Sequence, residues 1–148
     1  MNKTYSARPK DIERKWYVID AAENNLGRIS TEASRLLIGK DKPMFTSHID
    51  CGDFVIIINA KDLKVSGNKL TDKKYYRHSG YPGGLYTRSL QEQLDKDPAF
   101  VINKAIKGML PVNKLRDGRL LRLKIYTGSD HPHQAQKPIT ITTKKGDK

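Results

Sequence analysis

The amino-acid sequence predicts an α/β fold built on a parallel β-sheet with helices on both of its faces. A strand pattern at residues 16–20 is followed by an amphipathic helix pattern and then by an uninterrupted apolar run at residues 54–58. An apolar run without alternation is typical of a strand that is covered on both faces. Strand, helix and buried strand in that order form the crossover unit of a parallel sheet.

Length and composition indicate a single folded domain. The chain has 148 residues, of which 36% are hydrophobic, enough to build a core. Cys51 is the only cysteine, which excludes an internal disulfide and favours a reducing compartment. The longest apolar run is far too short to span a bilayer, and residues 1–15 contain no apolar secretory segment. We therefore expect a cytoplasmic protein without a membrane partner.

The elements of the first half follow from local residue types. Residues 16–20 are aromatic and β-branched and precede turn residues, so we predict a strand there. Apolar residues recur at helical spacing between residues 29 and 37, and Gly39 can end this helix in the left-handed conformation. Residues 53–59 are expected to form the central strand of the sheet.

The second half is predicted to contain an arm followed by helices. Residues 69–84 are strongly polar, so we expect an exposed arm, with a hairpin or excursion beginning near residues 67–68. Ser89 and Glu92 match a capping box at a helix start. Another helix is expected from Asp97 onward, because a proline follows it and apolar residues then share one face.

The last third is predicted to contain a helix, a strand and an extended exit. Leucines alternate with cations between residues 115 and 124, which indicates a helix and then a strand. Residues 124–127 are expected to form the last strand. A histidine and proline motif at residues 131–133 then begins an extended segment.

The net charge of +12 is concentrated in one half of the chain. Residues 1–60 carry nine basic and eight acidic side chains, whereas residues 61–148 carry nineteen and eight. Scattered solubilising charge would fall on both halves, so this asymmetry predicts a surface for a polyanion. RNA or DNA is the leading class of partner.

Residues 73–84 combine cations, aromatic rings and glycines, a mixture that suits RNA. Lysine and arginine neutralise phosphates, aromatic rings stack on unpaired bases, and glycines allow close approach of the backbone. Alternatively, the segment is an edge hairpin whose tyrosines pack on the sheet and whose charges are only solvated. The candidate RNA-binding residues of the arm are Lys69, Lys73, Lys74, Tyr75, Tyr76, Arg77, His78, Tyr81, Gly83 and Gly84.

A second basic stretch at residues 104–124 carries seven cations and a single acid. Its leucines can anchor it to the core, so its cations are expected to face phosphate, although an ordinary basic surface helix would show the same pattern. The candidates here are Lys104, Lys107, Lys114, Arg116, Arg119 and Arg122.

The sequence predicts no catalytic or metal site, and we expect no cofactor and no small-molecule substrate. His131 and His133 are candidate RNA contacts, but no cysteine or carboxylate pair completes a metal site around them. The enzyme alternative is a metal-dependent nuclease that uses Asp20, Asp50 and Asp53. In parallel strands Asp20 would end one strand and Asp53 would begin the next, so they would lie at opposite edges of the sheet.

Residues 73–84 and the motif Lys107-Gly108-Met109-Leu110-Pro111 resemble the family of bacterial ribosomal protein thirteen of the large subunit. The resemblance extends from about residue 4 to residue 138, with departures at residues 116–119 and 134–137 and at Ser47. Further matches lie, in order, at residues 15–21, 26–28, 45–46, 48, 50, 52–53, 59–60, 123–124, 126, 128 and 131–133.

The resemblance implies a three-layer α/β/α fold with a mainly parallel four-stranded sheet and an extended basic arm. It also implies a non-catalytic, structural role in the large ribosomal subunit of the cytoplasm, with large-subunit ribosomal RNA and neighbouring ribosomal proteins as partners and early entry into assembly. A regulatory RNA-binding protein outside the ribosome would share this chemistry. Within one domain of residues 1–148, we expect 1–60 to be mostly scaffold, 61–138 to face RNA and 139–148 to be a mobile tail.

Overall fold

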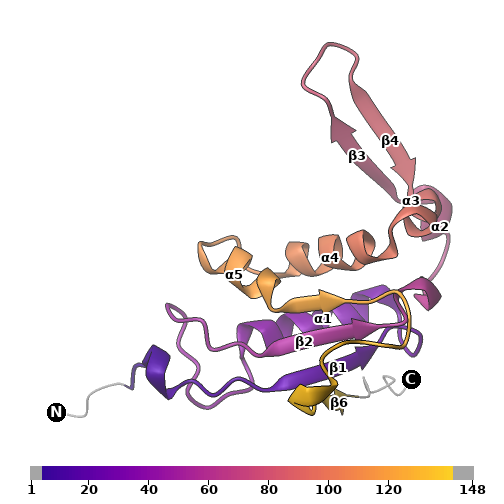
Figure 1. The fold of residues 1–148 in the computed structure, drawn as a ribbon. Helices are drawn as coiled ribbons and strands as arrows, with labels where there is room; N and C mark the ends of the chain where they lie inside the picture. Colours follow the sequence, from indigo (N-terminus) through magenta and orange to yellow (C-terminus); the bar gives the residue numbers. More distant parts are fainter. Residues whose placement is uncertain (1–4, 142–148) are drawn as a thin grey trace.

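The computed structural model describes residues 5–141, which form a four-stranded sheet and a projecting hairpin (Figure 1). The sheet has the order β5 (Leu123–Ile125), β2 (Phe54–Ile58), β1 (Trp16–Asp20) and β6 (Ile139–Ile141). Every neighbouring pair of these strands is parallel, and β2 lies inside the sheet. The predicted parallel sheet with an interior apolar strand is confirmed.

Helix α1 (Leu26–Ile38) connects β1 to β2 and buries the predicted apolar face. Ile29, Ala33 and Leu37 are completely buried because they lie on the side of the helix that faces the sheet. Gly39 ends the helix at a φ of 80°, and its N–H donates to the carbonyl oxygens of the last turn. The helix and its predicted stop are therefore confirmed.

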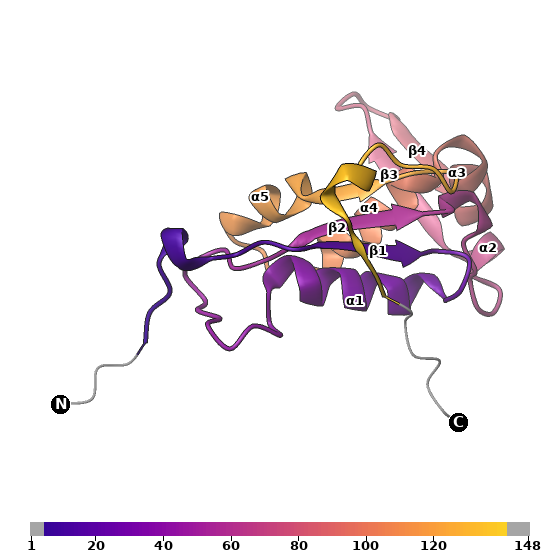
Figure 2. The same ribbon diagram turned by 60° about the horizontal axis from the view of Figure 1, so that its bottom comes forward.

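Helices flank the sheet, as expected for the three-layer architecture (Figure 2). Helices α1 and α4 (Pro98–Met109) pack against each other and against the face of the sheet that carries Val55 and Ile57. Side chains alternate along a strand, so Phe54 points to the opposite face. The C-terminal segment with the short 3-10 helix η3 (Gln134–Gln136) covers that face.

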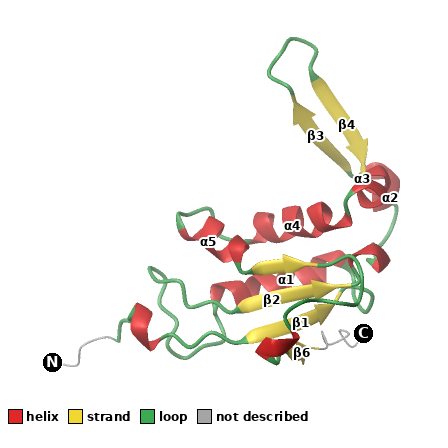
Figure 3. Cartoon of the chain, viewed as in Figure 1, coloured by secondary structure: helices red, strands yellow, loops and turns green. Residues whose placement is uncertain are grey.

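The predicted arm is an antiparallel hairpin that extends away from the sheet (Figure 3). The short helix α2 (Lys69–Asp72) leads into β3 (Lys74–His78), and β4 (Leu85–Ser89) returns to helix α3 (Leu90–Lys96). The hairpin turn itself lies at residues 79–84. Gly67-Asn68 forms the turn that precedes α2, so the excursion begins where it was predicted.

Both predicted helix starts of the second half are confirmed. The Ser89 hydroxyl accepts from the Glu92 N–H at 3.3 Å, and the Glu92 carboxylate accepts from the Ser89 N–H at 3.1 Å. Asp97 caps α4 through a hydrogen bond from the Phe100 N–H at 3.1 Å. These contacts satisfy N–H groups that a helix leaves free at its start.

The remaining elements are short. They comprise 3-10 helices η1 (Pro9–Asp11) and η2 (Ala60–Asp62) and helix α5 (Leu115–Leu121), which precedes β5 as predicted. The mobile tail predicted for residues 139–148 included β6, whose three residues instead pair with β1. Residues 142–148 of that prediction lie outside the described residues. No helix in residues 5–141 is long and apolar enough to cross a membrane.

Candidate nucleic-acid interface

The two faces of the β3–β4 hairpin carry different side chains, because neighbouring residues of a strand point to opposite faces. One face is a checkerboard of tyrosine and arginine in which Tyr75 pairs with Arg88, and Arg77 pairs with Tyr86. The other face carries Lys74, Tyr76 and His78 of β3 opposite Ser89, Thr87 and Leu85 of β4. Both faces therefore combine positive charge with aromatic rings.

Three tyrosines of the hairpin stand in solvent. Tyr76, Tyr81 and Tyr86 are 66%, 75% and 62% exposed. Their rings contribute little to the core, so the alternative that the arm's tyrosines pack on the sheet does not apply to these three. Exposed rings beside cations can stack on unpaired bases while the charges contact phosphate. Tyr86 and Arg88 did not emerge from the sequence as candidates, because only the hairpin register places Tyr86 opposite Arg77 and Arg88 opposite Tyr75.

Tyr75 differs from the other tyrosines of the arm, because its ring packs against the body of the protein, and its predicted stacking on bases stays a prediction. Its half-buried ring lies edge-on to Phe100 of α4, with ring centroids 6.1 Å apart. The Lys73 ammonium lies 5.5 Å from the centre of the same ring. Burial raises the pKa of Tyr75, and its hydroxyl has no hydrogen-bond partner within the described part of the chain. Tyr75 thus anchors the hairpin to the body.

The glycines at the tip serve the turn itself. Gly80 and Gly83 adopt φ values of 91° and 71°, a region that favours glycine. A Cβ on Gly84 would lie 2.0 Å from the Ser79 hydroxyl oxygen. The Gly80 N–H donates to Nδ1 of His78 at 2.9 Å, so one nitrogen of this ring orders the turn. Turn geometry therefore explains these glycines without any ligand.

A further group of cations lies on α4 and at the base of the arm. Lys104 and Lys107 of α4 are exposed, as are Lys69 and Lys73 beside α2. Lys114 is also exposed, just before α5. The sequence contains no acidic residue from 98 to 116, so this surface is positive with no carboxylate of its own segment to neutralise it. These lysines are therefore accessible from outside, and their contact with phosphate stays a prediction.

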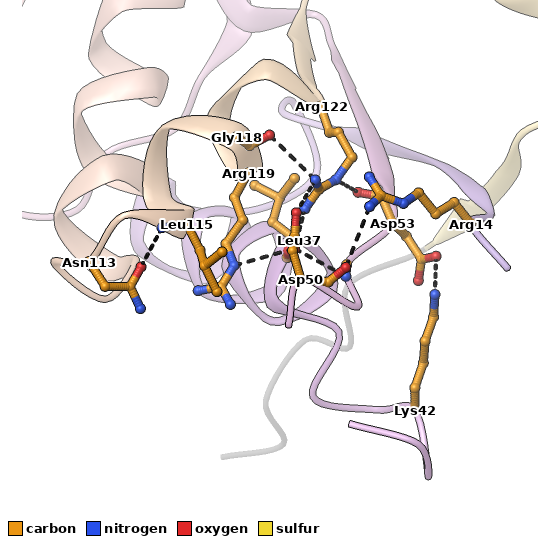
Figure 4. Close-up of polar contacts among 11 residues, drawn as sticks. Arg14, Leu37, Lys42, Asp50, Asp53, Asn113, Leu115, Gly118, Arg119 and Arg122 are labelled. Atoms are coloured by element: carbon orange, nitrogen blue, oxygen red, sulfur yellow. Dashed lines mark hydrogen bonds and ion pairs between the residues drawn. The ribbon is translucent and has the colours of Figure 1, made fainter. Parts of the chain in front are cut away.

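Arg119 and Arg122 are buried, which contradicts the prediction that they face phosphate. Only 2% and 5% of their surfaces are exposed. The guanidinium nitrogens Nη1 and Nη2 of Arg122 both donate to the carboxylate of Asp50, and Arg119 Nε lies 3.5 Å from Asp50 Oδ1 (Figure 4). Arg122 Nη2 also donates to the carbonyl of Leu37 at 3.1 Å. A buried guanidinium requires such partners, and they leave it unavailable to RNA.

The segment around this buried cluster is closely packed. Arg116 is half-buried, with a buried Nε that has no partner among the described residues. A Cβ on Gly52 would lie 1.8 Å from the carbonyl oxygen of Leu37. Only glycine therefore lets the chain enter β2 so close to the end of α1.

The three acids of the nuclease alternative are engaged separately. Asp50 pairs with the buried arginines, whereas Asp53 Oδ1 lies 2.6 Å from the Lys42 ammonium. Asp20 accepts from the side-chain amide of Asn59 at 3.0 Å. Asp20 and Asp53 also lie at opposite ends of their parallel strands, as predicted. Within residues 5–141 no group of three histidine, cysteine or carboxylate side chains could hold a metal ion.

The two candidate histidines near the C-terminus lie away from the arm. His133 packs 5.0 Å from the Trp16 ring and its Nε2 lies 2.8 Å from the Tyr126 hydroxyl. The His133 N–H donates to Nδ1 of His131 at 3.3 Å. Trp16 stacks on Phe54, on the face of the sheet opposite α4. These histidines secure the C-terminal segment to the sheet, and the fold does not bring them to the basic surface.

Comparison with known proteins gives one consistent result. The family model described as ribosomal protein L13 matches residues 14–132, which include the arm and the strands β1, β2 and β5 of the sheet. "Large ribosomal subunit protein uL13" of Symbiobacterium thermophilum is 54% identical over 138 residues, covering 93% of this chain and 96% of that protein. The protein of the same name from Chromobacterium violaceum is 52% identical over 139 residues, covering 94% and 98%. The one from Kocuria rhizophila is 54% identical over 136 residues, covering 92% of each chain.

Proposed function

Because this chain belongs to the ribosomal protein L13 family, we propose that it binds large-subunit ribosomal RNA through its hairpin arm and the exposed lysines of α4. Its relatives are named as proteins of the large ribosomal subunit, and its own role is that of a structural constituent of that subunit, in translation. The family is one of ribosomal structural proteins and not of enzymes. Neighbouring ribosomal proteins are its further partners.

The observation that carries this proposal is the composition of the arm's surface. Residues 69–89 hold five lysines or arginines and a single acid, Asp72. Exposed tyrosine rings lie between these charges, on both faces of the hairpin. Cations supply affinity for the phosphate backbone, and the rings add stacking on bases that are not paired. Folded RNA offers both kinds of contact.

The arrangement of the two halves supports different roles for them within one domain, one as scaffold and one as the RNA-facing surface. The arm projects well beyond the sheet, so it can enter a folded RNA while the sheet and α1 remain outside (Figure 1). Residues 1–60 supply most of the scaffold, and residues 61–138 supply the RNA-facing surface. An arm that lies between RNA segments has to enter before those segments close around it. This geometry supports early entry into subunit assembly.

A charge-reversal experiment tests the proposal. We expect Arg77→Glu combined with Arg88→Glu to reduce incorporation into large subunits about tenfold, because two phosphate contacts become repulsive. The matched control is Lys10→Glu with Lys40→Glu, which lowers the net charge equally at exposed positions of the first half. Incorporation is measured by gradient sedimentation of extracts from cells that express a tagged copy. Thermal unfolding of both variants should match that of the parent, because all four side chains are exposed.

Two outcomes of this experiment would contradict the proposal. Equal incorporation of the arm variant and its control would show that the hairpin face does not contact RNA. Recovery of the parent protein only in light gradient fractions would instead support a regulatory RNA-binding protein that acts outside the ribosome.

A further inference from the structure

A cleft of about 620 Å³ lies where the arm joins the body. The start of α1, helix α2 with its flanking residues, the start of α3 and the last turns of α4 form its walls. This volume lies within the range of pockets that hold small molecules. The cleft is therefore large enough for a single nucleotide, whereas an RNA duplex would only pass across its mouth.

The walls of the cleft combine an apolar floor with a positive rim. Leu26, Leu90 and Met109 provide apolar surface, and Met109 is 44% exposed. Lys69, Lys73 and Lys104 lie around the cleft, and Asp72 is the only acid that lines it. The first turn of α1 also faces the cleft and adds the positive end of its dipole. Such a cleft suits a flat, largely apolar ring that carries phosphate.

Two helical glycines line the same cleft, and no atom of residues 5–141 occupies the place of a side chain at either of them. A Cβ on Gly27 or on Gly108 would meet no atom within 4 Å, and neither residue has a positive φ. Gly108 is not a left-handed cap either, because α4 ends at Leu110 in an extended conformation. Glycine is unfavourable within a helix, and at these two positions it leaves the cleft room for close approach by a group outside the chain.

We propose that this cleft receives one unpaired nucleotide of the ribosomal RNA, with its base on the apolar floor and its phosphates at the three lysines. This inference rests on the proposed RNA-binding function and names one contact within it. An apolar side chain of a neighbouring protein could fill the floor, but it would leave the ammonium groups of the rim without counter-charge. An unpaired nucleotide covers the apolar floor with its base and neutralises the lysines of the rim with its phosphates.

A substitution series at Gly108 tests whether the cleft is occupied. Gly108→Leu should project a side chain into open space, fill the cleft and still fold, since no protein atom lies in its way. Gly108→Ala is the matched control, because it makes a similar change to the helix backbone and leaves most of the cleft open. We expect Gly108→Leu to reduce incorporation into large subunits about tenfold, the loss of one stacked and charged contact, and Gly108→Ala to stay within twofold of the parent. Equal incorporation of both variants would overturn the inference.

Photocrosslinking in assembled large subunits identifies the occupant. A benzophenone amino acid replaces Met109 in one sample and Tyr86 in another, and crosslinks are mapped by reverse transcription and mass spectrometry. We expect the Met109 probe to react with one unpaired nucleotide. Reaction with a ribosomal protein, with a paired nucleotide, or with nothing would overturn the inference if the Tyr86 probe still reaches RNA. Failure of the Tyr86 probe to reach RNA would count against the proposed function itself.

Discussion

The arm and the α5 segment (residues 115–122) are both rich in arginine, yet their arginines lie in opposite environments. Arg77 and Arg88 of the hairpin are exposed, whereas Arg119 and Arg122 of the α5 segment are buried on Asp50. Both segments carry the local signature of a basic surface. The comparison shows that the position of an acid elsewhere in the chain decides whether an arginine can face RNA.

The physical reason lies in the cost of removing charge from water. A guanidinium is buried only when a carboxylate and further hydrogen-bond acceptors replace its hydration. Asp50 provides that carboxylate for the α5 segment, and the carbonyl of Leu37 provides a further acceptor. Within the described residues, Arg77 and Arg88 of the hairpin pair with no acid, and both are exposed. Their charges are therefore free to bind an external anion. The buried arginines of the α5 segment instead form contacts that hold α1, β2 and α5 together.

Among the changes that test this comparison, replacing Asp50, the partner of the buried arginines, should have the largest effect on stability. Asp50→Asn leaves two buried guanidiniums without a counter-charge, so we expect it to lower the free energy of unfolding by about 3 kcal/mol. Asp41→Asn is the control, because Asp41 pairs with Arg35 at the surface and its loss should cost less than about 1 kcal/mol. Urea denaturation followed by circular dichroism measures both. Equal effects of the two variants would mean that the α5 arginines do not depend on Asp50.

A smaller effect is expected at the base of the arm. Ser89→Ala removes the capping box of α3 and should cost about 1 kcal/mol of unfolding free energy. Ser129→Ala, at an exposed serine with only a 3.4 Å contact to its neighbour, should change stability by less than about 0.5 kcal/mol. Thermal and urea denaturation measure the unfolding free energies of the two variants. If Ser89→Ala were neutral, the return of β4 into α3 would not depend on this cap.

The smallest predicted effect concerns the anchor of the hairpin. Tyr75→Phe keeps the ring against Phe100 and removes a buried hydroxyl that has no partner within residues 5–141. We expect a gain of up to about 1 kcal/mol in unfolding free energy at neutral pH. A decrease in unfolding free energy of more than about 1 kcal/mol would show that the hydroxyl makes a stabilising contact.

The pH dependence gives a second measurement on Tyr75. Burial raises its pKa above the ordinary value of 10.0, so the folded protein retains the phenolic proton longer than the unfolded chain does. Its contribution is therefore complete below pH 10 and is lost as the pH rises through the folded pKa. Tyr75→Phe should reduce this alkaline loss. Part of it should remain, because burial and then Asp53 and Asp41 also raise the pKa of Tyr17.

Local patterns were sufficient for most of the scaffold and for the existence of the arm. The apolar run of β2, the helical spacing of α1, its Gly39 stop and the Ser89 capping box each depend on residues that are close in the chain. Short-range geometry therefore makes them visible in the sequence. The charge asymmetry likewise indicated which half carries the exposed cations.

The sequence by itself determined the parallel sheet, the boundary between a neutral and a basic half, and the resemblance that the comparisons confirm. Only the tertiary structure decided which cations are available. Asp50 lies 72 residues before Arg122, and no local pattern reveals that they meet. The hairpin register that sets Tyr86 beside Arg77, and the cleft that joins Gly27 to Gly108, arise in the same way. Burial and pairing between distant segments depend on the whole fold, whereas secondary structure depends mainly on neighbours.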